Sequence, residues 1–398
     1  MARNIITGID IGSSITRVVV AEEKKGSLPH ILAAVSKPTS GLRKGYVTDI
    51  ESVGQSVISA IKGAEKAAGI QIKHAYLAIG GISLGSVKSK DSTTVSRADA
   101  EISDPDIKRL LEQCESGLTN MSNKYILHRI PLSYKIDGNP ALGRPLGMKG
   151  AKLEVEMLFI TSLAQHVEDL IHAVESSGIA IDDIVASPYA SSFAALTKQQ
   201  REVGCILTNI GSSTVSIVVF EEGKPLSLEV FPIGSAHITH DIALGMQVPL
   251  EEAEKIKTEY GSSEGISKKK LSDIIDARLN DIFDLIEAHL KKINRNGLLP
   301  AGIILVGGGS NLVSLDEIAK SSLKLPAKVC KSFERGFAKS QGPNSKDYVL
   351  TDPAWSVPLG LILIGIKDEE LGIREPGEAN VLGKTRGAFS KLLRNFMP

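Results

Sequence analysis

Aromatic residues are scarce in this sequence of 398 residues, at 4% of the composition. We therefore expect no large stacking platform for bases or sugars. The formal net charge is zero, so no overall field attracts the chain to nucleic acid, and nucleic acid is not expected as a partner. Any electrostatic attraction to a membrane or a protein must come from local charge.

Cysteine and long apolar runs are also lacking. Cys114, Cys205 and Cys330 are odd in number, far apart and outside any Cys-x-x-Cys or Cys/His cluster, which argues against a disulfide framework and a zinc site. We expect three buried thiols. The N-terminus lacks the pattern of a signal peptide, and the most apolar stretch, 359–366, is far shorter than the ~20 residues that span a bilayer.

An internal repeat is the first positive feature. Residues 10–14 (DIGSS) and 209–213 (NIGSS) each lie between two short apolar, strand-like segments, a pattern that predicts a β-hairpin. The two hairpins are separated by about half the chain length. Together with a length that suggests two or more domains, this spacing predicts a duplicated α/β fold with one hairpin turn in each half.

The paired turns are suited to binding phosphate, because a glycine leaves backbone N–H groups accessible and nearby hydroxyls add donors. One such hairpin alone is usually just a turn, but two at matching places indicate a nucleotide cleft. The candidate phosphate-binding residues are Gly12, Ser13, Ser14 and Arg17 in the first half and Gly211, Ser212, Ser213 and Thr214 in the second.

Two further features join the candidate site. Gly307, Gly308 and Gly309 follow a buried strand at 303–306; alone they read as a strand-to-helix turn, and they match neither a Walker loop nor a dinucleotide fingerprint. Glu254 and Lys257 share one face of a predicted helix. Such a pair is most often a solvated ion pair, and the alternative is that it binds a ribose and an adenine edge.

Taken together, these pieces resemble the actin superfamily, which clamps ATP and Mg²⁺ between two halves of a ribonuclease-H-like fold. The resemblance implies that Gly234 joins the nucleotide-binding set and that Asp10 and Asn209 lie at the Mg²⁺.

Within that superfamily the sequence resembles the FtsA family of bacterial cell-division proteins over essentially its whole length. Residues 128–137 (HRIPLSYKID) match the family's His-x-Ile-Pro-x-x-Tyr-x-Ile-Asp, and 191–197 and 358–361 also follow its pattern. The resemblance implies an ATP-binding, polymerising adaptor that tethers the tubulin-like protein FtsZ to the cytoplasmic face of the inner membrane at the division site. It also implies self-association into filaments and contacts with other division proteins.

The resemblance also predicts the domain organisation. The expected units are subdomain 1A at 1–82 and 161–200, an inserted α+β subdomain 1C at 83–160, subdomain 2A at 201–242 and 300–367, subdomain 2B at 243–299, a linker at 368–385 and a terminal helix at 386–398. The local pattern predicts a helix to residue 68 capped by Asp49, a helix over 162–177, strands near 125–130 and 152–161, and a loop over 137–150.

Two departures from the superfamily concern hydrolysis. Asn209 stands where the second hairpin usually has Asp, and hard cations prefer anionic oxygen. Ser187 stands where hydrolysing members have a Glu that positions water. We therefore expect slow hydrolysis and assign no catalytic residue.

The last residues predict a basic amphipathic helix. Phe389, Leu392, Leu393 and Phe396 share one face, and Lys391 and Arg394 supply positive charge, a pattern typical of helices that lie in an anionic membrane interface. The alternative is a helix that docks on the protein body.

The long amphipathic helix before residue 293 carries the expected partner site. The resemblance implies that Arg278 and Asp281 bind the acidic-hydrophobic C-terminal peptide of FtsZ, and the alternative is an ion pair within the helix. The rival functions are a PilM-like component of pilus assembly, which the terminal helix disfavours, and an actin-fold sugar kinase or chaperone-type ATPase.

Overall fold

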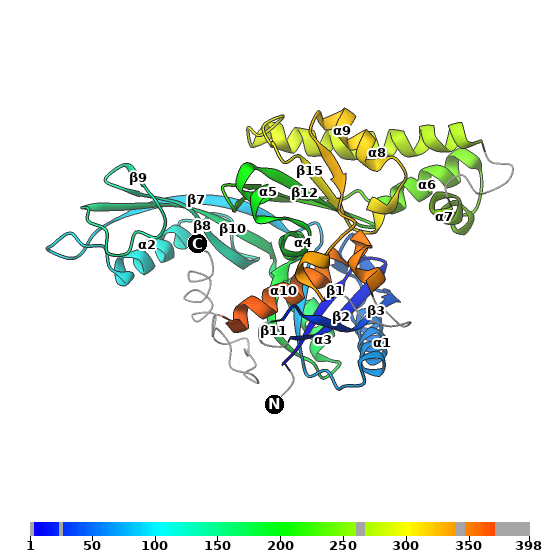
Figure 1. Ribbon diagram of the computed structural model, residues 1–398, viewed down its shortest axis with the longest axis horizontal. Helices are drawn as coiled ribbons and strands as arrows, with labels where there is room; N and C mark the ends of the chain where they lie inside the picture. The colour runs from blue at the N-terminus through cyan, green and yellow to red at the C-terminus, as the bar shows by residue number, and fades with distance from the viewer. Residues whose placement is uncertain (1–3, 24–26, 260–266, 339–346, 371–398) are drawn as a thin grey trace.

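The computed structural model describes residues 4–23, 27–259, 267–338 and 347–370. Two five-stranded sheets form its centre (Figure 1). The first has the order β11-β6-β1-β2-β3 and consists of β1 (Asn4–Ile11), β2 (Ile15–Glu23), β3 (His30–Pro38), β6 (His74–Ile79) and β11 (Ala180–Ala186). The second has the order β14-β13-β12-β15-β16 and consists of β12 (Cys205–Ile210), β13 (Val215–Glu221), β14 (Lys224–Phe231), β15 (Ile303–Val306) and β16 (Ala327–Val329).

The two sheets have the same topology. In each, the first three strands pair antiparallel, and the two remaining strands of the sheet add in parallel on the other side of the first strand. Their first hairpins are the two predicted from the sequence repeat. The prediction of a duplicated fold is therefore confirmed.

Helices cover both sheets. Those of the first half are α1 (Ile50–Ala68), α3 (Ala164–Glu175), α4 (Ser187–Ala195) and α5 (Lys198–Val203); those of the second are α6 (Ser235–Met246), α7 (Leu250–Thr258), α8 (Lys268–Lys292) and α9 (Leu315–Leu323), with α10 (Ser356–Glu370) following. Short elements are β4 (Leu42–Arg43), β5 (Tyr46–Val47) and the 3₁₀ turns η1 (Gly308–Asn311), η2 (Glu334–Gly336), η3 (Asp347–Leu350) and η4 (Pro353–Trp355).

The predicted start of α1 is confirmed, because the Asp49 side chain accepts the N–H groups of Glu51 and Ser52, as an N-cap does. The helix predicted over 162–177 is shorter than expected at both ends. Its preceding strand continues through Leu163 and leaves only 164–175 helical.

The insertion forms a separate lobe with its own core. Its strands are β7 (Gly85–Thr94), β8 (Lys124–Ile136), β9 (Asn139–Ala141) and β10 (Lys152–Leu163), in the order β7-β10-β8-β9, and its helix is α2 (Asp104–Ser116). Figure 1 shows this lobe extending away from the two central sheets.

Two predictions within the insertion need correction. The expected loop over 137–150 contains β9, which pairs with β8. The strand expected near 125–130 continues to Ile136 and includes Pro131. Proline, which has no N–H, is tolerated there because the register shifts beside it, with Met157 opposite Pro131 and Glu156 opposite Ser133.

Helices α4 and α10 join the two halves. Both pack tightly against each other, and α10 also contacts β1 while α4 contacts β12. One hydrophobic cluster includes side chains of both central sheets together with these helices. At Gly360 of α10 an added Cβ would lie 1.9 Å from the carbonyl oxygen of Ala190 in α4. The helices therefore meet backbone to backbone.

Three predictions about the remainder of the chain have different outcomes. All three cysteines are buried and free, as expected. The linker expected to begin at residue 368 is partly helical, because α10 continues to Glu370. The rest of that linker and the predicted terminal helix lie outside the described residues. Within the described ranges, no helix is long and apolar enough to cross a bilayer.

Replacing Gly360 with Ala is expected to destabilise the fold, because the new methyl group has no space against Ala190. Overpacking of this kind costs about 1–3 kcal/mol, measurable as the free energy of unfolding in urea. The matched control is Gly54→Ala in α1, where the Cβ would meet only Ser176 Oγ at 3.4 Å. That variant should gain about 0.5–1 kcal/mol from helix propensity. Equal stability of the two variants would contradict the backbone contact.

Candidate functional site

A cleft of about 1060 Å³ opens between the two halves. The structure brings together nearly all of the sequence-predicted site residues on its walls. Those that line it are Asp10, Gly12, Ser13, Ser14, Arg17, Asn209, Gly211, Ser212, Thr214, Glu254, Lys257, Gly307, Gly308 and Gly309. Ser213 and Gly234 do not line it. The cleft is thus formed by segments that are far apart along the chain.

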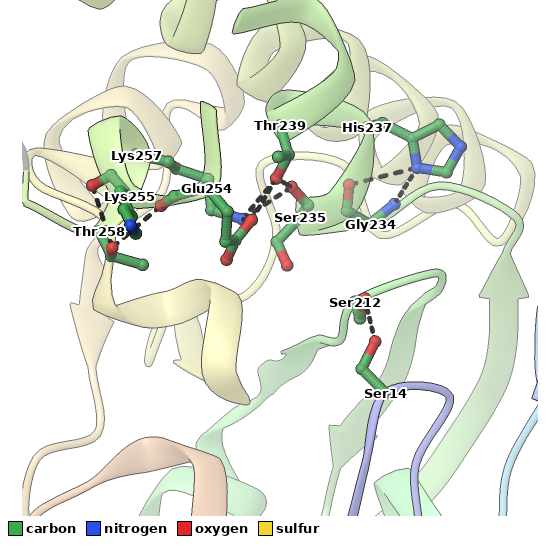
Figure 2. A network of polar contacts seen from close by, with 10 residues as sticks. All are labelled: Ser14, Ser212, Gly234, Ser235, His237, Thr239, Glu254, Lys255, Lys257 and Thr258. Atoms are coloured by element: carbon green, nitrogen blue, oxygen red, sulfur yellow. Dashed lines mark hydrogen bonds and ion pairs between the residues drawn. The ribbon is translucent and has the colours of Figure 1, made fainter. Parts of the chain in front are cut away.

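The two hairpin turns have matching backbone geometry and meet at their tips. Gly12 N–H donates to the Ile15 carbonyl at 3.2 Å, and Gly211 N–H donates to the Thr214 carbonyl at 2.9 Å. The Ser14 hydroxyl donates to the Ser212 hydroxyl at 2.7 Å across the cleft (Figure 2). The two turns therefore face one position from opposite sides.

The N-terminus of helix α6 holds the second turn in place through two backbone hydrogen bonds. The N–H groups of Ser235 and Ala236 donate to the carbonyls of Gly211 and Ser212, both at 2.9 Å. In a trans peptide the N–H points away from the C=O, so the amides of Ser212 and Ser213 point away from α6. Neither amide donates a hydrogen bond within the described part of the chain. Such a pair of free N–H groups is an anion-binding arrangement.

Gly234 has a structural role in this arrangement. A Cβ there would lie 2.5 Å from the Ser212 carbonyl oxygen and 2.7 Å from that of Gly211. Glycine at 234 is therefore required for α6 to approach the second turn, although the residue does not itself line the cleft.

The three consecutive glycines differ in what surrounds them. Gly307 has a φ of +89°, and a Cβ there would lie 2.2 Å from Asn209 Oδ1. At Gly309 a Cβ would lie 2.5 Å from Cγ2 of Ile210. At Gly308 the nearest atom is Cβ of Ala354 at 4.0 Å. Gly307 and Gly309 thus permit packing on β12, whereas Gly308 leaves space in the cleft.

Asp10 and Arg17 lie opposite each other in the first hairpin. Burial raises the pKa of Asp10 to about 6, although the positive charge of Arg17 opposes this. Burial also lowers the pKa of Arg17, against the opposing effect of Asp10 and Asp352, and its guanidinium lies 5.7 Å from the ring centroid of Trp355. A carboxylate that is short of compensating charge fits a site for a cation.

The residues present fit a Mg²⁺ that reaches the protein largely through phosphate and water. No group of three or more His, Cys, Asp or Glu side chains that could hold a metal occurs in the described ranges. Mg²⁺ typically keeps several waters and binds one or two carboxylates together with substrate phosphates. Asp10, with the Asn209 side-chain oxygen, would supply the protein's share.

Glu254 and Lys257 belong to a hydrogen-bond network that also includes Thr239 and Ser235 (Figure 2). Lys257 Nζ donates to Glu254 Oε2 and Thr239 Oγ1, both at 2.7 Å, and to the Ser235 carbonyl at 3.3 Å. The Thr239 hydroxyl also donates to Glu254 Oε2 at 2.6 Å. Lys257 is buried and Glu254 is about half exposed, so the pair is not a solvated ion pair.

This network determines which of the two charged groups, the Lys257 ammonium or the Glu254 carboxylate, is free to face the cleft. An ammonium has three donors, and all three of Lys257 are used within the protein. Lys257 therefore orients Glu254, and the Glu254 carboxylate is the exposed group of the pair in the cleft. Thr239 had no sequence signal, because its role depends on α6 and α7 lying side by side.

Several other cleft residues also lacked a sequence signal as ligands. Gly45, in the turn between β4 and β5, packs so closely that a Cβ would lie 2.2 Å from the Gly81 Cα. His166 Nε2 lies 2.9 Å from the Gly80 carbonyl oxygen. Ser187, the first residue of α4, lines the cleft at the position where hydrolysing relatives were expected to have an acid.

The predicted partner residues lie elsewhere, on α8. Arg278 binds Asp241 of α6 through two hydrogen bonds of 2.6 and 2.9 Å and Asp281 of its own helix at 3.0 Å. The ion pair within the helix is therefore present, accompanied by a stronger one to α6. Binding of a partner peptide by Arg278 and Asp281 stays a prediction. The membrane-binding residues predicted at 389–396 lie outside the described residues.

Asp10→Asn is expected to change how stability depends on pH in the metal-free protein. Since the folded pKa of about 6 lies above the usual value, wild type has its full stability below about pH 4 and loses it as the pH rises through 6. The variant should gain on wild type by up to about 1.4 kcal/mol per pH unit across that window.

Unfolding in urea between pH 4 and 8 measures this difference, with Asp284→Asn as the control for removal of one exposed carboxylate outside the cleft. Adding ATP and Mg²⁺ at pH 7.5 should stabilise wild type more than the Asp10 variant. A stability difference independent of pH would contradict the assignment of Asp10 as a destabilising buried carboxyl.

Comparison with known proteins matches both the sequence and the fold. A profile for the cell division protein FtsA matches residues 206–360, and one for the SHS2 domain inserted in FtsA matches 81–161. The cell division protein FtsA of Borreliella burgdorferi is 30% identical over 385 residues, covering 91% of each chain. That of Pseudomonas aeruginosa is 28% identical over 391 residues, covering 93% of this chain and 91% of the relative.

Solved structures show the same fold at low identity. A PilM–PilN type IV pilus biogenesis complex gives a TM-score of 0.69 at 20% identity, covering 91% of this chain and 98% of that one. MreB5 of Spiroplasma citri bound to ADP gives 0.54 at 12% identity, covering 92% and 97%. The predicted actin-like fold with an insertion in its first half is confirmed, and the chain belongs to the FtsA family of cell division proteins.

Proposed function

We propose that this protein is an ATP- and Mg²⁺-binding adaptor that polymerises and tethers FtsZ to the cytoplasmic face of the inner membrane at the division site. The nucleotide part rests on one observation: two matched turns face each other across the cleft, and the second directs the unused amides of Ser212 and Ser213 away from α6. The adaptor part rests on membership of the FtsA family and on the sequence of the terminal segment.

The same geometry supports slow hydrolysis. Ser187 at the first residue of α4 offers no carboxylate to orient water. Asn209 offers a neutral oxygen, and its side chain is packed against Gly307. The cleft is therefore better suited to holding a nucleotide than to cleaving it.

Pilus assembly is the nearest alternative function. It is supported by the fold similarity to a PilM–PilN complex, whereas the relatives that match along the sequence are cell division proteins. The predicted terminal amphipathic helix also favours division. The chaperone-type ATPase alternative gains no support from the cleft, since Ser187 lies where the resemblance places the water-orienting acid of hydrolysing members.

Gly308→Val is expected to abolish ATP binding while leaving the fold intact. The side chain meets no protein atom closer than 4.0 Å at its Cβ, so its bulk occupies the space proposed for the nucleotide. Calorimetry with ATP and Mg²⁺ measures affinity, and the unfolding midpoint without nucleotide confirms folding. The control is Gly85→Val, at an open position of β7 outside the cleft. Unchanged affinity of the Gly308 variant would mean that the site is misplaced.

The FtsZ-binding proposal requires a variant that keeps the α6–α8 ion pair. Arg278→Glu alone would put the new carboxylate next to those of Asp241 and Asp281. Weaker peptide binding by that variant could then reflect damage to α8. The exchange Arg278→Asp with Asp241→Arg retains a pair but moves the positive charge from α8 to α6. It should weaken binding of the FtsZ C-terminal peptide in a salt-dependent manner.

The control for this experiment is the exchange Arg295→Glu with Glu221→Arg, a pair of 2.7 Å elsewhere in the second half. Peptide binding should survive that exchange. If wild type and the Arg278/Asp241 exchange bind the peptide equally well at low and at high salt, Arg278 does not bind the peptide. Its role would then be limited to the ion pairs with Asp241 and Asp281.

Leu393→Glu is expected to release the protein from anionic vesicles, because it puts a carboxylate into the apolar face of the predicted terminal helix. Each large apolar side chain on that face contributes at most ~1.5–3 kcal/mol, and each basic residue adds about 1 kcal/mol near an anionic surface. Together these contributions predict reversible membrane binding for a single chain. A filament that presents many copies of the helix should remain attached much longer.

Vesicle co-sedimentation measures the release, and Leu382→Glu in the predicted linker is the matched control that should bind as wild type does. Wild-type sedimentation of the Leu393 variant would favour a helix that docks on the protein body.

A further inference from the structure

The first turn of α6 is capped by a histidine. The Gly234 N–H donates to His237 Nδ1 at 3.1 Å (Figure 2). The Gly234 carbonyl already accepts the backbone N–H of His237 at 3.0 Å. His237 Nδ1 also lies 3.3 Å from that carbonyl oxygen, so a ring of either tautomer has one partner in Gly234. Only a ring that accepts at Nδ1 leaves both polar groups of Gly234 satisfied, because a ring that donates from Nδ1 leaves the Gly234 N–H without its acceptor.

In two other helices, α2 and α5, the third residue also accepts the N–H of the N-cap residue, but there the N-cap side chain returns a bond. Asp106 of α2 accepts the Ser103 N–H at 3.1 Å, and Gln200 of α5 accepts the Thr197 N–H at 2.8 Å. At those helices the N-cap hydroxyl also bonds to the third residue of the helix, a reciprocal capping box. The N-cap of α6 is Gly234, which has no side chain, so the return bond is absent and His237 is the sole side-chain cap described at this helix start.

The cap is directly connected to the second phosphate turn. The next two residues of α6, Ser235 and Ala236, donate to the carbonyls of Gly211 and Ser212. The Gly234 backbone itself lies against those carbonyls. Any rotation of the Gly234 peptide therefore moves the donors that hold the turn, and with them the direction of the Ser212 and Ser213 amides.

We propose that His237 is a positioning residue for the second phosphate turn. By accepting the Gly234 N–H it fixes the start of α6, and so aims the Ser212 amide at the phosphoryl groups of a bound nucleotide. His237 does not line the cleft and touches no ligand in this account. The inference rests on the proposed nucleotide binding and adds the residue on which the phosphate end of the site depends.

The test compares His237→Ala with His237→Gln. Alanine removes the acceptor, whereas glutamine restores it in the way that Gln200 caps α5. The Ala variant should bind ATP with Mg²⁺ about five- to tenfold more weakly, as expected for one hydrogen bond of ordinary net strength. The Gln variant should recover wild-type affinity. His172→Ala, at an exposed histidine of α3, is the control and should bind as wild type does.

Adenosine, measured by competition, separates a phosphate-specific effect from general damage. Its affinity should be the same for all variants, because it has no phosphate to meet the second turn. Equal losses for ATP and adenosine, or no recovery with Gln, would overturn the proposal.

Hydrogen exchange without nucleotide distinguishes failure of this inference from failure of the proposed function. The amides of 234–236 should exchange faster in the Ala variant and return to wild-type rates in the Gln variant. If wild type binds no nucleotide, the proposed function fails whatever these amides do. If wild type binds ATP but the exchange rates do not change, the cap has no positioning role and the inference fails alone.

Discussion

Close approach of backbone segments around the cleft is the constraint on which the rest of this structure depends. At Gly360 two helices meet, at Gly234 a helix meets the second turn, and at Gly307 the glycine turn meets Asn209, each with no room for a Cβ. Because these contacts join different segments of the chain, they fix the relative positions of the two turns. The Ser14–Ser212 hydrogen bond is a consequence of that placement.

The site also contains charge that the fold alone does not favour. Burial raises the pKa of Asp10 and lowers that of Arg17. The charged form of each group is therefore less stable in the protein than it would be in water. Such groups persist where a ligand completes the charge balance. A nucleotide with its Mg²⁺ would do so, since the cation compensates Asp10 and the phosphates compensate Arg17. The metal-free protein is therefore expected to gain stability from its ligand.

Much of the fold could be predicted because its signals are local or repeated. Asp49 marks the start of α1, and the two Gly-Ser-Ser hairpins reveal the duplication. Errors arose where an element boundary depends on distant pairing: β9 forms because β8 offers it an edge, and β10 continues through Leu163 because β8 pairs with it that far. The cleft residues that belong to sequence motifs could be predicted from the sequence, although Ser213 and Gly234 of that set do not line the cleft. Thr239, Gly45 and His166 could not be predicted, since each reaches the cleft only through packing between separate segments.

The central claim is that one nucleotide binds both turns at once, and a crystal structure with a non-hydrolysable ATP analogue and Mg²⁺ tests it most directly. The account predicts phosphate oxygens within hydrogen-bond distance of amides in both turns, at Ser13 or Ser14 in the first and at Ser212 in the second. It places the cation near Asp10 and Gly308 against the nucleotide. A nucleotide that contacts a single turn, or that binds outside the cleft between the halves, would contradict it.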